Sequence, residues 1–163
     1  SPMRIHALAL SALLTLNACG PDTADAGAAE VALDTTAVVA AVRARADGFA
    51  SAVVGGNIDS VLSYLSSDVV LLEPGMDIKG RDAFRALLAD LWKVYKVTSF
   101  TMSPEAHTVA PDLVTEFGRY RETYTDSTGK ELACDCVYSV IWRKEPDGVW
   151  RQARIHAGQP VKQ

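Results

Sequence analysis

Carboxylate and phenol side chains recur at even-numbered positions of the segment 113–125. The residues that share this spacing are Glu116, Tyr120, Glu122 and Tyr124. Because successive side chains of a β-strand point to opposite faces, residues separated by an even number of positions lie on the same face. If the segment is a strand, these side chains form one polar and aromatic surface that is suited to line a pocket.

A second alternating set occupies the segment 130–144. One face carries Cys134, Cys136, Tyr138, Val140 and Trp142, and the other carries Asp135, Ser139 and Arg143. The first face is the more apolar, so we expect Tyr138 and Trp142 to lie in the interior. Three further aromatic residues would complete an aromatic pocket: Tyr64, Trp92 and Tyr120. The alternative is an ordinary core in which each tyrosine hydroxyl has a local partner.

Arg154 and His156 share one face of the segment 149–157 by the same alternation. The guanidinium of Arg154 has the geometry to bind a carboxylate ligand, and the imidazole of His156 titrates near neutral pH. The alternative is structural, with ion pairs to Glu116 or Glu122. The sequence leaves both interpretations open.

Cys134 and Cys136 lie two positions apart, so both thiols point to the same face of a strand. A disulfide between them would be strained, and we expect two buried thiols that act as small apolar side chains. Redox chemistry or copper binding would need further ligands. His107 and His156 do not have a ligand spacing, and a strong zinc site needs four partners. The sequence thus predicts neither a metal site nor a cofactor.

The N-terminal segment has the features of a secretory signal. Arg4 precedes an apolar run over 7–16, which is shorter than the roughly 20 residues of a bilayer span. The segment 16–19 (LNAC) resembles a bacterial lipobox, which implies cleavage before Cys19 and lipidation of that cysteine. A buried N-terminal amphipathic helix is the alternative.

This resemblance divides the chain into a signal peptide (1–18), a lipidated cysteine with a flexible tether (19–33) and one domain (34–160). The tether is rich in Ala, Gly, Asp, Pro and Thr, a composition typical of a flexible linker. Residues 1–2, ahead of Met3, are interpreted as a cloning scar or an overlong reading of the gene. Gly20 follows the cysteine where an Asp would retain the protein at the inner membrane. By analogy with enterobacterial sorting, we expect a lipid anchor in the outer membrane, facing the periplasm.

Periodicity predicts the elements of the domain. Apolar residues at helical spacing predict helices over 37–54, 59–66 and 80–95, and runs of apolar or alternating residues predict strands over 68–73, 97–109, 113–125, 130–144 and 149–157. Helices that precede a set of antiparallel strands favour an α+β fold, with the helices on one face of a curved, mostly antiparallel sheet. The net charge of −4 gives no basic surplus for nucleic acid, and 163 residues leave no room for a separate cofactor domain.

Three motifs, in this order, resemble the nuclear transport factor 2-like (NTF2-like) superfamily, which includes SnoaL-like and ketosteroid isomerase-like proteins. They are 56–59 (GNID), 68–75 (DVVLLEPG) followed by Gly80-Arg81, and 142–144 (WRK) followed by 147–151 (DGVWR). The last hairpin, with His156 and Pro160 after it, is also similar to the association domain of calmodulin-dependent protein kinase II. The resemblance covers 36–160 and implies a cone-shaped α+β fold that commonly forms homodimers.

The resemblance also implies roles for single residues. Glu73 occupies the position of the general base of ketosteroid isomerase-like members, at the end of the first strand and before a proline. A carboxylate in an apolar cone has a raised pKa and is able to move protons. The oxyanion-donor position on the first helix falls on Phe49, which has no hydroxyl, and the second donor position falls on Tyr138. The alternative for Glu73 is a cap on the turn at 74–75.

Together these observations predict a periplasm-facing lipoprotein whose domain binds a small apolar or amphipathic molecule. The predicted pocket residues are Phe49, Tyr64, Trp92, Glu116, Tyr120, Trp142 and Arg154. An acid–base enzyme of isomerase, dehydratase or cyclase type is the alternative, with Glu73, Tyr138 and His156 as catalytic residues. A third interpretation is an interaction module that dimerises through the open face of its sheet.

Overall fold

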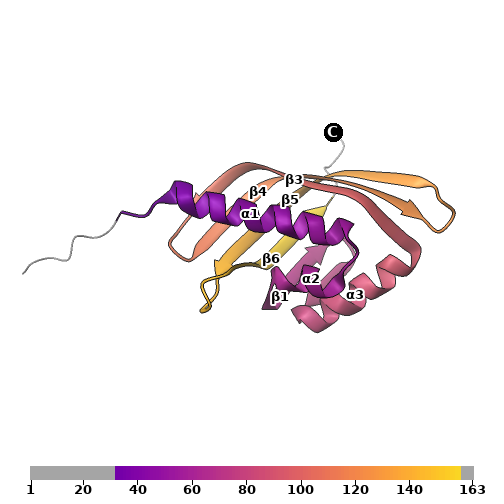
Figure 1. Ribbon diagram of the computed structural model, residues 1–163, viewed down its shortest axis with the longest axis horizontal. Helices are drawn as coiled ribbons and strands as arrows, with labels where there is room; N and C mark the ends of the chain where they lie inside the picture. Colours follow the sequence, from indigo (N-terminus) through magenta and orange to yellow (C-terminus); the bar gives the residue numbers. More distant parts are fainter. Residues whose placement is uncertain (1–31, 159–163) are drawn as a thin grey trace, which may run out of the picture. The chain divides into compact units, whose positions relative to one another are not determined.

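The computed structural model describes residues 32–158, so the predictions for the signal peptide and for Cys19 lie outside the described residues. Three helices pack on a six-stranded sheet (Figure 1). The elements are α1 (Thr35–Val54), α2 (Ile58–Ser63), β1 (Leu65–Glu73), β2 (Met76–Lys79), α3 (Gly80–Val94), β3 (Tyr95–Val109), β4 (Leu113–Asp126), β5 (Glu131–Lys144) and β6 (Trp150–Gly158). The predicted α+β class is confirmed.

The strands follow the order β2-β1-β6-β5-β4-β3 across the sheet. All neighbouring strands are antiparallel except β1 and β6, which are parallel. The helix α1 runs along the curved sheet, and α2 and α3 lie near β1 (Figure 1). Within residues 32–158, no helix has the length and apolarity that spanning a bilayer requires.

Side-chain caps set where the first two helices begin. Asp34 accepts a hydrogen bond from the backbone N–H of Ala37, and Asn57 accepts one from that of Ser60, each at 2.9 Å. Both bonds satisfy N–H groups that have no partner within the helix. The helix α1 therefore begins at Thr35, two residues before the predicted start at 37.

The short strand β2 is absent from the sequence-based prediction, which places only a turn at 74–75. In the structure β1 and β2 form a hairpin in which Glu73 pairs with Met76. Gly75 has φ +81°, a conformation that glycine adopts without strain. Four residues are too few to show a clear alternation. The hairpin fixes Glu73 as the last residue of β1.

An irregularity in β6 reverses its alternation. Ile141 of β5 pairs with Arg154, whereas Trp142 pairs with Gln152, so Ala153 is an extra residue. Gln152 and Ala153 are consecutive yet both buried. Arg154 then turns outward, although strict alternation places it on the same face as Gln152.

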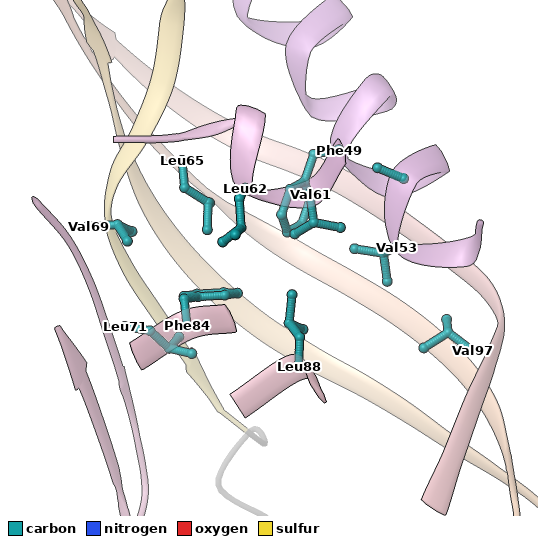
Figure 2. Close-up of a cluster of buried hydrophobic side chains, with 11 residues drawn as sticks. Phe49, Val53, Val61, Leu62, Leu65, Val69, Leu71, Phe84, Leu88 and Val97 are labelled. Atoms are coloured by element: carbon teal, nitrogen blue, oxygen red, sulfur yellow. The ribbon is translucent and has the colours of Figure 1, made fainter. Parts of the chain in front are cut away.

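The buried side chains form two clusters under the helices. The first lies between the C-terminal half of α1, α2, α3 and the sheet, and Figure 2 shows Phe84 and Leu88 of α3 facing Phe49 and Val61. The second lies under the N-terminal half of α1, and its members are Val42, Ala46, Val114, Tyr138, Val140, Trp142 and Trp150. An unfilled space borders the first cluster.

Candidate functional site

A cavity of about 180 Å³ lies in the first cluster, between the helices and the sheet. Most of its lining is apolar: Phe49, Val53, Val61, Leu71, Met76, Phe84, Leu87, Leu88, Leu91, Trp92, Phe100, Met102, Val140, Ile155 and Ala157. The polar lining residues are Glu73, Tyr120, Glu122, Tyr138 and Gln152. An outer cleft of about 610 Å³ shares Glu73, Trp92, Tyr120 and Glu122 with the cavity. The two carboxylates therefore lie where the cavity meets the cleft.

Glu73 reaches the cavity from the end of β1. The hairpin to β2 holds its backbone, and the side chain is half-buried among apolar residues. Burial raises the pKa of Glu73, and the positive charge of His156 on the adjacent strand offsets part of this rise. The alternative role as a turn cap gains no support, because none of the hydrogen bonds at this turn involves its carboxylate.

Glu122 reaches the same cavity from β4. Its backbone pairs with Phe100 of β3 and Cys134 of β5, which directs the side chain to the covered face. Burial raises the pKa of Glu122 to about 7, and the negative charge of Glu73 adds to the effect. At neutral pH this carboxyl group is therefore both a proton donor and a proton acceptor.

Gln152 lines the cavity from the irregular part of β6. Its side chain is 1% exposed, and its Nε2 atom has no hydrogen-bond partner. A buried amide N–H without a partner costs about 1–3 kcal/mol. The cavity thus contains a donor that an incoming acceptor would satisfy.

Tyr138 lines the cavity with its ring, but its hydroxyl is already engaged. The hydroxyl donates a 2.6 Å hydrogen bond to Oε1 of Glu116, whose side chain is 0% exposed. Arg43 Nη1 lies 3.5 Å from the same carboxylate, and His107 Nε2 lies 3.0 Å from its other oxygen. Burial, followed by the bond to Glu116, raises the pKa of the Tyr138 phenol. The carboxylate of Glu116 therefore belongs to a structural cluster, and it does not line the cavity.

The family model for the SnoaL-like domain matches residues 46–153. The chain belongs to this family. Its cavity lies where the helices and the sheet of the domain enclose the first cluster. No curated protein sequence matches the chain.

Solved structures agree with this SnoaL-like fold. A ketosteroid isomerase-like protein from Erwinia carotovora atroseptica is 19% identical, with a TM-score of 0.66 over 76% of this chain and 96% of that one. An NTF2-like superfamily protein from Salmonella enterica serovar Typhimurium is 15% identical, with a TM-score of 0.68 over 78% and 94%. A Xanthomonas campestris protein described as a calcium/calmodulin-dependent protein kinase II association domain is 22% identical, with a TM-score of 0.60 over 77% and 88%. At these identities the likeness shows the fold alone.

Four predicted aromatic residues of this SnoaL-like domain take different places. Phe49, Trp92 and Tyr120 line the cavity, and the ring of Tyr120 stacks on Phe100 with a centroid distance of 5.6 Å. Tyr64 lies behind Phe49, edge-on to it, with the guanidinium of Arg45 over its ring. Tyr64 is therefore a support for the cavity wall and does not line it.

Three other predicted pocket or catalytic residues lie away from the cavity. Trp142 is fully buried in the second cluster under α1. The side chain of Arg154 is 46% exposed, and its guanidinium donates to the backbone oxygen of Asp68. His156 is exposed on the same outer face. The expected roles of Arg154 and His156 inside a pocket are wrong because the extra residue in β6 turns both outward.

Cys134 and Cys136 form a disulfide at the edge of the outer cleft, with their Cα atoms 5.6 Å apart. The prediction of two free thiols is therefore wrong, since this Cα separation lies within the range that a disulfide bridges. In the described part of the chain, no group of three His, Cys, Asp or Glu residues is placed to hold a metal ion.

Glu122 and Gln152 are absent from the predicted pocket residues, although the alternation of their strands indicates both. Glu122 shares the predicted inward face with Tyr120, but no catalytic role was expected for it. Gln152 shares the predicted inward face of the segment 149–157 with Arg154 and His156, and it keeps that direction because it precedes the extra residue Ala153. The site therefore combines the predicted Glu73 with two polar groups that the predicted site lacks.

The substitution Glu122→Gln is expected to stabilise the protein at pH 8 but not at pH 5. The folded state keeps a proton on Glu122 up to a pKa of about 7, whereas the unfolded chain releases it near pH 4.3. The contribution of this group to the free energy of unfolding therefore falls as the pH rises between these values. Glutamine is uncharged at either pH and avoids this loss.

Urea unfolding of both proteins at the two pH values measures the difference. The matched control is Glu131→Gln at an exposed site at the start of β5, which should change neither value. An equal effect of Glu122→Gln at pH 5 and pH 8 would contradict the raised pKa.

Proposed function

We propose that this SnoaL-like domain binds a small, largely apolar molecule in the cavity beside α3. The observation that carries this proposal is the unfilled space of about 180 Å³ within an otherwise close-packed cluster. Protein interiors leave few voids of this size, and an engineered apolar cavity of roughly 150 Å³ binds benzene. The outer cleft of about 610 Å³ gives a ligand a route to the cavity.

The arrangement of phenols also favours binding over an isomerase of the ketosteroid type. The donor position on the first helix is Phe49, and the hydroxyl of Tyr138 donates to Glu116 instead of into the cavity. Loss of one oxyanion donor lowers a rate by about 10²–10³. The phenolic donor of that mechanism is therefore lacking here, and the hydroxyl at the second donor position is engaged outside the cavity.

The variant Ala157→Leu should weaken binding of a neutral probe, 2-naphthalenemethanol, by about tenfold or more. Ala157 is buried and lines the cavity, so a larger side chain there occupies the space that the naphthalene ring needs. Isothermal titration calorimetry measures the dissociation constant. Ala106→Leu, at an exposed position of β3, is the matched control and should bind like the wild-type protein. Undiminished binding to Ala157→Leu would contradict the proposed location.

Acid–base catalysis is a second candidate, supported by the pair of carboxyl groups in the cavity. Glu73 would take a proton from a carbon next to a carbonyl group, and the oxygen of the resulting enolate would accept hydrogen bonds. The donors would be Gln152 Nε2 and the protonated form of Glu122. An amide and a carboxylic acid are both established oxyanion donors.

Exchange of deuterium into 2-tetralone, an apolar bicyclic ketone, tests this chemistry. Glu73→Gln should reduce the exchange rate to near that of buffer, because glutamine accepts no proton and Glu122 acts in this scheme as an oxyanion donor. Gln152→Leu should reduce the rate by about 10²-fold, the effect of one oxyanion donor. Glu131→Gln, outside the cavity, should exchange at the wild-type rate, as measured by proton NMR. Exchange at the wild-type rate in Glu73→Gln would show that Glu73 is not the base.

We also propose that the uncovered face of the sheet pairs with a second copy of the chain. Leu72, His156, Ser139 and Phe117 form a row across β1, β6, β5 and β4. Leu72 is 46% and Phe117 48% exposed, large values for apolar side chains on a sheet. Contact between two such rows would bury both residues.

Light scattering at micromolar concentration should give the mass of a dimer for the wild-type chain and of a monomer for Phe117→Lys. A lysine in the row would be buried without a partner in the dimer, which disfavours association. Val54→Lys, at an exposed apolar position at the end of α1, is the matched control and should remain dimeric. A monomeric wild-type chain would contradict the pairing.

A further inference from the structure

The carboxylates of the cavity restrict the charge of its ligand. No Lys, Arg or His of the described residues lines the cavity or the cleft. His156 acts on Glu73 only from the outer face of the sheet. A ligand that covers Glu73 and Glu122 removes their water, which costs free energy unless the ligand brings positive charge or hydrogen-bond donors. An anionic ligand would be repelled.

Aromatic rings surround the same carboxylates. Trp92 and Tyr120 line both spaces, and Tyr95 and Tyr124 line the cleft, where their rings meet edge to face with centroids 5.3 Å apart. The faces of such rings attract ammonium groups, and aromatic cages are a recurrent way of binding alkylated amines. Acidic and aromatic side chains thus occur together at the mouth of the cavity.

Gln152, at the end of the cavity opposite the two carboxylates, gives an independent observation. Its amide is 1% exposed, lines the cavity and lacks a partner for Nε2. Leu72, the neighbour of Glu73, pairs with His156, four residues from Gln152 along β6. On β5, the partner of Gln152 is Trp142 and that of His156 is Ser139, three positions away, so at about 3.3 Å per residue these pairs lie about 10 Å apart. Apolar side chains line the space between them.

We propose that the cavity binds a cationic amphiphile: an amine placed between Glu73 and Glu122, an apolar body, and a hydrogen-bond acceptor that faces Gln152. This identification of the ligand class rests on the proposed binding function. The amine offsets the charge of the carboxylates, the body fills the apolar space, and the acceptor satisfies Nε2. An amide or an ether oxygen at the far end has the required chemistry.

Four probes on one ring system separate these contributions: 2-naphthylmethylamine, its 6-methoxy derivative, 2-naphthalenemethanol and 2-naphthoate. Titration calorimetry with the full chain at pH 8 should show the amine binding about tenfold more tightly than the alcohol, and the carboxylate binding most weakly. The methoxy group should strengthen binding of the amine further. Equal affinity for amine and alcohol would overturn the proposed charge while leaving the binding cavity intact.

The pH dependence follows from the ionisation of Glu122. Lowering the pH from 8 to 5.5 protonates this group, whose pKa is raised to about 7, and should weaken amine binding more than tenfold. Binding of the alcohol should not change. The facing phenol of Tyr120, with its pKa raised to about 12, stays neutral throughout. The same titrations with His156→Gln should show the same pH dependence of amine binding. That result would exclude a contribution from the imidazole on the outer face of the sheet.

Two variants test which residue contacts which end of the ligand. Glu122→Gln should reduce amine affinity to that of the alcohol, and the control Glu131→Gln should not. Gln152→Leu should abolish the advantage of the methoxy derivative while leaving the preference for amine over alcohol. An unchanged amine preference in Glu122→Gln, or an unchanged methoxy advantage in Gln152→Leu, would overturn the corresponding contact. Failure of every probe to bind would overturn the proposed function as well.

Discussion

The arrangement of the domain depends on one buried carboxylate, that of Glu116. A charge without access to water requires partners, and these come from separate elements: Arg43 of α1, His107 of β3 and Tyr138 of β5. Because the partners converge on one strand, α1 is held in a defined position across the sheet. Removing His107 would leave Oε2 of the buried carboxylate without its hydrogen-bond partner, so the contact specifies position as well as stability.

This contact also determines which polar groups are available in the cavity. The helix α1 covers the second cluster with its first half and bounds the cavity with Phe49 and Val53 of its second half. The hydroxyl of Tyr138 is engaged on the side of Glu116. The remaining polar groups of the cavity are therefore two carboxyl groups, the phenol of Tyr120 and one amide. That composition differs from the set implied by the ketosteroid isomerase resemblance, which includes a phenol on the first helix.

A shared fold thus carries a different site. The SnoaL-like match and the solved structures show the shared fold, and in this chain the β1–β2 hairpin presents Glu73. The same frame accepts Phe49 in place of a phenol and Glu122 on the opposite wall of the cavity, because side chains on the covered face change without disturbing the backbone ladder. The function of this domain therefore follows from its own side chains.

The sequence by itself determined the order of helices and of the long strands, because apolar periods of 3.6 and 2 are local properties. It also determined that Tyr120, Tyr138 and Trp142 face inward, and that Glu73 ends a strand before a turn. Only the tertiary structure decided which inward residues border an empty space. Trp142 lies in the second cluster because α1 covers it, and Arg154 and His156 point outward because Ala153 is an extra residue in β6. Gln152 precedes this irregularity and keeps the inward direction that alternation predicts, whereas the residues after it exchange faces.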